Sequence, residues 1–110
     1  MIVISDTSPL NYLVLIGQDS VLPILFDRVA APPAVIAELG HHGSPQVVRD
    51  WAAAPPAWLE ILTPATIDSA LGLGAGETEA IGLARELHAD TLLIDERKAA
   101  VVVDCMGNVV

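Results

Sequence analysis

The sequence predicts an α/β fold in which a central parallel sheet is flanked by helices. Short aliphatic runs alternate with helical patterns along the 110 residues, which is typical of parallel strands joined by helical crossovers. Hydrophobic residues make up 53% of the chain and aromatic residues only 4%, so the core must be aliphatic. That composition suits strands buried on both faces. The length is enough for one small domain, and we expect residues 1–110 to form it.

The amino-terminal segment predicts a buried strand followed by a helix. Residues 1–5 are a short β-branched run that ends at Asp6. Ser8 can cap a helix whose first residue is Pro9, because a proline at the first helical position loses no hydrogen bond. We therefore expect a helix that begins after Ser8 and ends at Gly17.

The rest of the chain continues the alternation of helices and strands. The further expected helices start at a polar cap or a proline and carry apolar residues at helical spacing. They cover residues 19–26, 33–39, 44–54, 77–87 and 96–106. The further expected strands are the short apolar runs 28–31, 59–63 and 91–95. Val109 and Val110 look like the start of another strand, so we expect the carboxyl-terminal strand and helix to be truncated or altered, or a partner to complete the sheet.

Charge and cysteine content narrow the class of protein. The formal net charge is -9 and no cluster of Lys and Arg is present, which disfavours tight binding of duplex nucleic acid. No run of 18 apolar residues predicts a membrane span, and the first residues lack the basic segment of a signal peptide. Cys105 is the single cysteine and cannot form an internal disulfide. We therefore expect a cytoplasmic protein.

Two expected strands end directly in an aspartate. Asp6 follows the first strand, and Asp95 follows the apolar run 92–94. Ligands of open α/β sheets bind beyond the carboxyl ends of the strands, so we expect both carboxylates at that edge. An aspartate there can also simply cap the next helix. Two of them in one sheet, with more acids nearby, favour a functional site.

Further acids lie on helices that should reach the same edge. Glu38 is close to the glycine that ends its helix, and Glu77 opens the helix after a glycine-rich turn. A carboxylate in a first turn is also favoured by the helix dipole, which is the structural alternative for Glu77. Glu79 points elsewhere on that helix and either supports the site or is solvated.

Four converging carboxylates would repel one another without a cation. Mg²⁺ and Mn²⁺ prefer oxygen ligands, usually carboxylates together with water. Such a cation lowers the pKa of a bound water and stabilises the leaving oxygen in phosphodiester hydrolysis, and a carboxylate can help to deprotonate the attacking water. Thr7 and Ser8 are candidates to hold metal-bound water or to orient the first aspartate. The expected catalytic and metal-binding residues are Asp6, Glu38, Glu77 and Asp95.

The motifs around these acids resemble those of the PIN-domain family. Asp6-Thr7-Ser8-Pro9-Leu10 is similar to its Asp-x-Ser opening, and Glu38 falls where that family places its second acid. Gly76-Glu77-Thr78-Glu79-Ala80-Ile81, followed by Leu92-Leu93-Ile94-Asp95, resembles the Gly-Glu-x-Glu-Ala branch related to VapC-type toxins. The separation of Glu77 and Asp95 also suits the third and fourth acids of the family. The resemblance runs along essentially the whole chain.

The resemblance implies a PIN-like fold and a Mg²⁺- or Mn²⁺-dependent endoribonuclease that cuts single-stranded or structured RNA. It further implies the toxin of a toxin–antitoxin pair, with a cognate antitoxin as partner and a homodimer as the assembly. The roles of the family's four acids carry over to Asp6, Glu38, Glu77 and Asp95. Many relatives have aspartate as the third acid, and here that acid is Glu77 or Glu79. The alternative is a catalytically inactive PIN-like scaffold that binds a partner.

Other features of the sequence carry weaker signals. The pair His41-His42 lacks partners at zinc spacing, so a solvated loop is expected. The glycine-rich residues 72–76 lack the Gly-Lys-Ser/Thr ending of a phosphate loop. Trp51 lies on an apolar helical stripe and is expected to pack in the core or an interface. A haloacid-dehalogenase-like phosphatase would need an aspartate where Ser8 stands. A phospho-receiver domain would need an acid before the first-strand aspartate and a late lysine.

Overall fold

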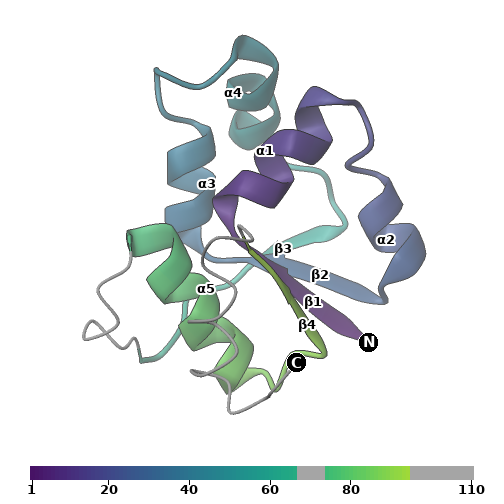
Figure 1. The fold of residues 1–110 in the computed structure, drawn as a ribbon, viewed down its shortest axis with the longest axis vertical. Helices are drawn as coiled ribbons and strands as arrows, with labels where there is room; N and C mark the ends of the chain where they lie inside the picture. Colours follow the sequence, from purple (N-terminus) through teal and green to yellow (C-terminus); the bar gives the residue numbers. More distant parts are fainter. Residues whose placement is uncertain (67–73, 95–110) are drawn as a thin grey trace.

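The computed structural model describes residues 1–66 and 74–94 (Figure 1). The predicted site residue Asp95, the predicted helix 96–106 with Cys105, and the expected final strand lie outside the described residues. In the described part the elements are β1 (Ile2–Ser5), α1 (Thr7–Leu15), α2 (Val21–Leu25), β2 (Arg28–Ala31), α3 (Pro33–Leu39), α4 (Gln46–Ala53), β3 (Leu59–Ile61), α5 (Ala75–Glu86) and β4 (Thr91–Leu93).

The four described strands form one parallel sheet in the order β3-β2-β1-β4. β1 is therefore central, with β2 on one side and β4 on the other. Ser5 at the end of β1 is level with Leu93 at the end of β4, and Ala31 at the end of β2 is level with Ile61. The carboxyl ends of these strands thus share one edge, as in other open α/β sheets. The predicted parallel α/β sheet flanked by helices is confirmed.

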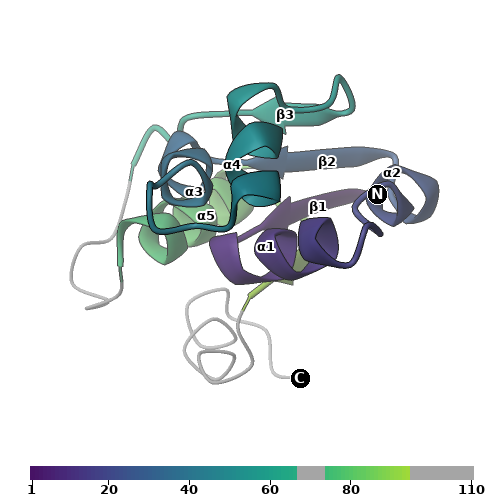
Figure 2. The same ribbon diagram turned by 90° about the horizontal axis from the view of Figure 1, so that it is seen from above.

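Helices cover both faces of the sheet (Figures 1 and 2). Alternate residues of β1 point to opposite faces: Val3 packs in the core beneath α1, α3 and α4, and Ile4 packs in the core beneath α5. Both residues are fully buried. The two cores are aliphatic, as the composition predicts. The sheet is the middle of three layers, and it holds the start of α1 and the start of α5 near the same edge.

The first helix begins earlier than the sequence signals predict. Asp6, and not Ser8, is the capping residue of α1, with extended backbone angles of φ -81° and ψ 178°. Pro9 is consequently the third helical residue. A proline is tolerated there because the N–H groups of the first turn have no partner within the helix. Asp6 is therefore both the residue that follows β1 and the capping residue of α1.

Other helices also differ from their predicted bounds, and α4 (Gln46–Ala53) is shorter at both ends than the predicted helix 44–54. α5 begins at Ala75 with Gly74 as its capping residue, so Glu77 is its third residue and not its first. α2 is shorter than the predicted helix 19–26, because residues 18–22 first form turns through Val21 N–H to Gln18 C=O (3.1 Å) and Leu22 N–H to Asp19 C=O (3.2 Å). In α5, Gly74 is thus the capping residue and Gly76 the second helical residue.

α5 ends in a left-handed residue that is not glycine. His88 has a φ of 52°, and its N–H donates to the carbonyl of Arg85 at 3.3 Å. Ala89 N–H donates to the carbonyl of Ala84 at 2.9 Å, which completes a Schellman cap. α1 ends in the same motif with Gly17 (φ 70°) at the left-handed position. A side chain at such a position costs conformational free energy that glycine does not.

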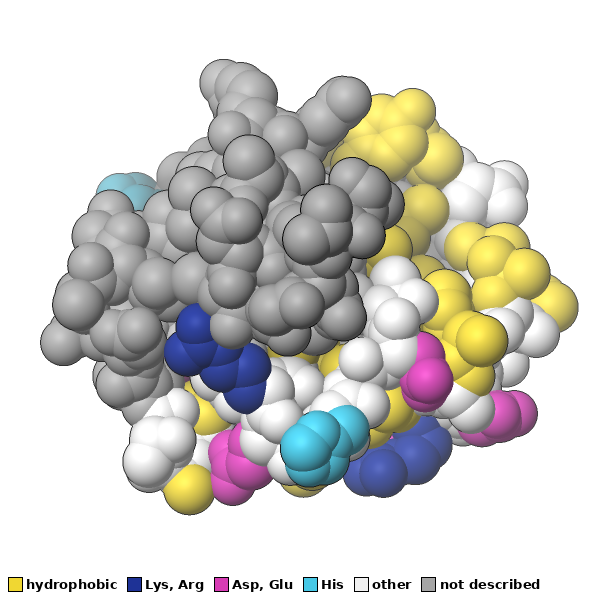
Figure 3. All heavy atoms as spheres, turned by 60° about the horizontal axis from the view of Figure 1, so that its bottom comes forward, with side chains coloured by type: hydrophobic (Ala, Val, Ile, Leu, Met, Phe, Trp, Pro, Cys, Tyr) yellow, Lys and Arg dark blue, Asp and Glu magenta, His cyan; other side chains and the backbone are white. Residues whose placement is uncertain are grey.

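Large apolar side chains are exposed around α2. Ile24 is 78% exposed, Leu25 63% and Met1 62%. Figure 3 shows hydrophobic side chains gathered on that side of the molecule, whereas the acidic and basic side chains of this face are scattered. Among the described residues, no helix is long and apolar enough to cross a membrane.

Candidate functional site

Asp6 lies at the carboxyl edge of the sheet between two strands. Its N–H donates to the carbonyl of Leu93 in β4 at 2.9 Å, and its own carbonyl accepts from the Ser5 hydroxyl at 3.0 Å. Asp6 is almost completely buried, with 1% of its surface exposed. As the capping residue of α1, it sits where the helix dipole favours a negative charge. The backbone of the first predicted acid is thus fixed by its neighbours.

Glu38 approaches the same edge from α3. Its Oε1 accepts a hydrogen bond of 3.1 Å from the Thr7 hydroxyl, and Thr7 is the first residue of α1. The two residues come from helices that follow different strands, so the bond ties α3 to the start of α1. Glu38 itself is exposed, which leaves its carboxylate accessible to solvent and ligands. Thr7 thus positions Glu38, whereas the sequence suggested that Thr7 holds metal-bound water or orients Asp6.

Two glycines at the start of α5 allow carboxylates to lie against its backbone. A Cβ atom on Gly76 would stand closer to Glu38 Oε2 than real Cβ atoms ever do, 3.0 Å from Glu38 Cδ and 3.0 Å from Thr7 Oγ1. A Cβ atom on Gly74 would lie only 2.7 Å from Glu77 Oε2. The start of α5 therefore accepts Glu38 from α3 and its own Glu77, because neither glycine carries a side chain.

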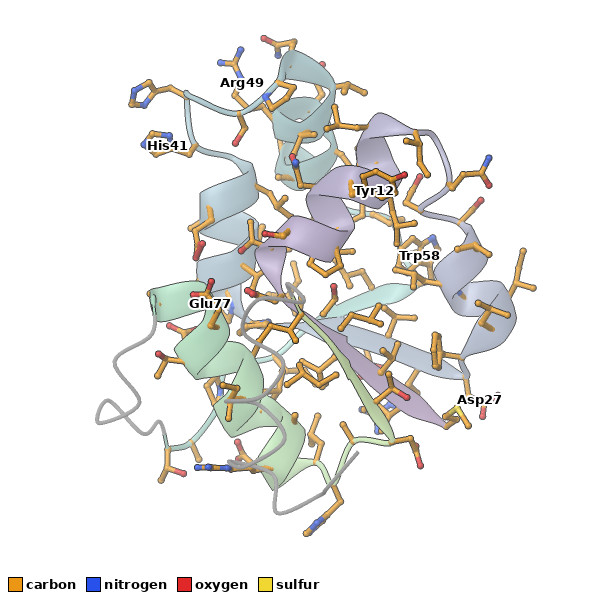
Figure 4. The ribbon with its side chains drawn as sticks, viewed as in Figure 1. Tyr12, Asp27, His41, Arg49, Trp58 and Glu77 are labelled. Carbon is orange, nitrogen blue, oxygen red and sulfur yellow. The ribbon has the colours of Figure 1, made fainter. Side chains whose placement is uncertain are left out.

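The two glutamates of α5 point to different neighbours. Glu77 is 9% exposed and its carboxylate folds back over the start of its own helix, as the close approach to Gly74 shows. Glu79 Oε1 instead accepts a hydrogen bond of 3.4 Å from Ala34 N–H, in the first turn of α3. Glu79 thus caps α3, the helix that carries Glu38. Figure 4 shows Glu77 at the start of α5, next to α3.

The structure brings most of the predicted residues of the described part to one place. Asp6, Thr7, Glu38 and Glu77 lie at the end of β1 and the first turns of α1 and α5. Ser8 is exposed on α1. Sequence reasoning missed Gly74 and Gly76 as contact positions. The signal that could have found them is a pair of glycines two residues apart, directly before a glutamate.

The donor atoms of this site are oxygens, which suits Mg²⁺ or Mn²⁺. In residues 1–66 and 74–94, however, no group of three or more His, Cys, Asp or Glu side chains is close enough together to hold a metal ion. The fourth predicted acid, Asp95, directly follows Ile94, the last described residue.

Comparison with protein families identifies the chain. A family model described as a PIN domain matches residues 2–107, which includes every residue of this site and Asp95. The search of curated proteins finds no match, and the search of solved structures finds none. PIN domains are generally nucleases, and the four-stranded parallel sheet flanked by helices is consistent with their fold. The chain belongs to the PIN-domain family.

Proposed function

We propose that the chain is a Mg²⁺- or Mn²⁺-dependent endoribonuclease that hydrolyses phosphodiester bonds of single-stranded or structured RNA. The observation that supports the proposal is that Asp6 and Glu77 lie at the starts of α1 and α5, and that Glu38 contacts both helix starts through Thr7 and Gly76. Carboxylates from three separate elements gather there in a chain that belongs to a family of nucleases. Carboxylates that served only to stabilise helix starts would not need to lie at one edge of the sheet.

The proposed metal ligands are Asp6, Glu38, Glu77 and Asp95. A divalent cation bound by them would supply an activated water and neutralise charge on the phosphate. The protein's part is to hold the carboxylates in place: the Leu93 carbonyl fixes the backbone of Asp6, and the Thr7 hydroxyl holds Glu38. Asp95 enters the proposal from the sequence, as the second residue after Leu93.

The toxin role, the antitoxin, the homodimer and the cytoplasmic location belong to the same proposal. The exposed apolar side chains Ile24 and Leu25 support a protein partner, because large contiguous apolar surface is unusual on a monomer. The net charge of -9 favours a basic partner.

One observation favours a second candidate, a PIN-like scaffold that binds a partner without cutting RNA. The described acids alone do not form a group that could hold a metal. Under this alternative, Glu77 and Glu79 would serve only to stabilise the first turns of α5 and α3. The nuclease should bind Mn²⁺, whereas the scaffold need not.

The test is cleavage of a labelled single-stranded RNA with Mn²⁺, with EDTA, and by substituted proteins. Asp6→Asn and Asp95→Asn should each abolish cleavage and leave the circular dichroism spectrum intact. Asp50→Asn is the matched control, because Asp50 is an exposed acid of α4 whose carboxylate accepts from Gln46 at 2.6 Å. Unchanged cleavage in either site variant would refute the assignment. A folded protein that neither cleaves RNA nor binds Mn²⁺ would establish the scaffold.

A further inference from the structure

The chain has few positive groups with which to meet a polyanion. It contains five Lys and Arg residues against 14 Asp and Glu. Three arginines are described, and Arg28 is already bound in an ion pair with Glu60 at 2.9 Å. Arg85 lies in the last turn of α5, at the end remote from the acidic site. Arg97 and Lys98, the other two cationic residues, lie outside the described residues.

Arg49 on α4 is the arginine that remains in the described part of the chain. Its Nη2 donates to Gln46 Oε1 at 2.7 Å. Within residues 1–66 and 74–94 it makes no ion pair. The neighbouring Asp50 is bound through Gln46 Nε2 at 2.6 Å, so Gln46 stands between the two charges. The Nε atom of Arg49 is buried and has no hydrogen-bond partner within the described residues, so Nη1 and the second N–H of Nη2 are the donors left for an incoming anion.

The loop before α4 presents two imidazoles in a fixed arrangement. The rings of His41 and His42 lie with their centroids 4.1 Å apart and their planes inclined by 33°. Gly43 N–H donates to His41 Nδ1 at 3.0 Å, which puts the proton of the neutral ring on Nε2. The Ser44 hydroxyl donates to the carbonyl of Glu38 at 3.2 Å. Both histidines are exposed, so their ring N–H groups are accessible to a ligand.

This loop is continuous with the acidic site. His41 follows Glu38 by three residues, just after the end of α3, and its N–H donates to the Glu38 carbonyl at 3.2 Å. The Glu38 carboxylate in turn contacts Thr7 and lies against Gly76. In Figure 4, α3 runs between His41 and Glu77, and Arg49 lies beyond the same end of α3 as His41. A strand leaving the site along α3 would pass over the loop.

We propose that His41, His42 and Arg49 form a contact surface for the phosphate backbone of the RNA strand, next to the site of cleavage. The inference rests on the proposed function and adds the path of the substrate to it. Guanidinium and imidazole N–H groups bind phosphate oxygens through charge-assisted or ordinary hydrogen bonds. Such contacts position the strand without reading its sequence. They also offset the repulsion between RNA and a chain of net charge -9.

The experiment measures binding of a fluorescein-labelled single-stranded RNA by fluorescence anisotropy at several NaCl concentrations. The protein carries Asp6→Asn so that the probe stays intact. Adding Arg49→Gln or His42→Ala should raise Kd about fivefold. For Arg49→Gln the slope of log K against log salt should also fall by about 0.7, the value for one lost phosphate contact on a single strand. With the native Asp6, Arg49→Gln should raise KM and leave kcat unchanged.

Arg28→Gln is the matched control. It removes the same charge from the first residue of β2, at the opposite edge of the sheet, and should leave Kd and the salt slope unchanged. Equal weakening by Arg28→Gln would mean that only net charge matters and would overturn the inference. If neither Arg49→Gln nor His42→Ala weakens RNA binding, this inference is overturned and the proposed function is not. Failure of the Asp6→Asn protein and of the native chain to bind RNA at all would overturn the proposed function as well.

Discussion

Replacing Gly76 by alanine should disturb the acidic site without destabilising the fold. Gly76 is the second residue of α5, where alanine is the better helix former and has fewer unfolded conformations to lose. The new Cβ, however, would enter the space of the Glu38 carboxylate and lie 3.0 Å from Thr7 Oγ1. Glu38 is exposed, so its side chain can swing away at little cost to the fold. The Glu38 carboxylate cannot, however, keep its present position.

The size of the effect can be worked out from the contact distances. Glu38 Cδ would have to withdraw from 3.0 Å to an ordinary contact of at least 3.4 Å, and its Oε2 would have to move further. A displacement of about 1 Å in a catalytic group costs about 100-fold in rate, equal to about 2.7 kcal/mol of transition-state stabilisation. The free energy of unfolding should change by less than about 1 kcal/mol. The Gly76→Ala protein should therefore lose most of its cleavage activity and keep nearly all of its stability.

The assay combines urea unfolding with RNA cleavage in Mn²⁺. Gly40→Ala is the matched control, because a Cβ there would meet its nearest atoms, Ile36 O and Ala52 Cβ, at 3.5 and 3.8 Å. It should change neither Mn²⁺ affinity nor kcat/KM. In a Glu38→Ala background, Gly76→Ala should have no further effect on Mn²⁺ affinity. Full activity in Gly76→Ala, or a loss that persists without the Glu38 carboxylate, would refute the reasoning.

Three further predictions concern the scaffold around the site. His88→Gly should raise the free energy of unfolding by about 1 kcal/mol, since it removes a side chain from a left-handed residue; an unchanged denaturation midpoint would contradict this. The hydrogen bond from Arg28 lowers the pKa of Glu60, so this pair stabilises the fold above pH 4.5 and the effect is lost as pH falls through the lowered pKa. Because both side chains are partly exposed, Glu60→Gln should cost about 0.5 kcal/mol or less at neutral pH and nothing in acid, as thermal melts at both pH values would show. Glu79→Ala should weaken Mn²⁺ binding by loosening the helix that carries Glu38, whereas Glu79→Gln keeps an acceptor and should restore it in calorimetric titrations.

The parallel sheet and the edge position of Asp6 could be predicted because both depend on local pattern. A short apolar run that ends in an acid specifies a buried strand with a carboxylate at its end, whatever the rest of the chain does. The predicted start of α1 was wrong because Ser8-Pro9 is a good local cap signal, and the extended backbone of Asp6 took that role two residues earlier. Local signals fix helix ends only within a few residues.

The internal geometry of the site could not be predicted, because it depends on contacts between distant parts of the chain. Thr7 and Glu38 are separated by 31 residues. Nothing in the sequence near Gly76 says that the carboxylate pressed against it comes from α3. The choice between Glu77 and Glu79 likewise depends on which neighbour each glutamate meets. Glu79 bonds to the first turn of α3, and that contact exists only once the helices are packed.

The acids of the candidate site lie at helix starts, where the helix dipole favours negative charge. Asp6 caps α1, and Glu77 lies in the first turn of α5. Glu38 contacts the starts of both helices, through Thr7 on α1 and Gly76 on α5. Each helix start carries about half a positive charge and stabilises a nearby carboxylate by about 0.3 to 1 kcal/mol. Two helix dipoles therefore oppose the mutual repulsion of three carboxylates without neutralising it, and the charge that remains is what a divalent cation would bind.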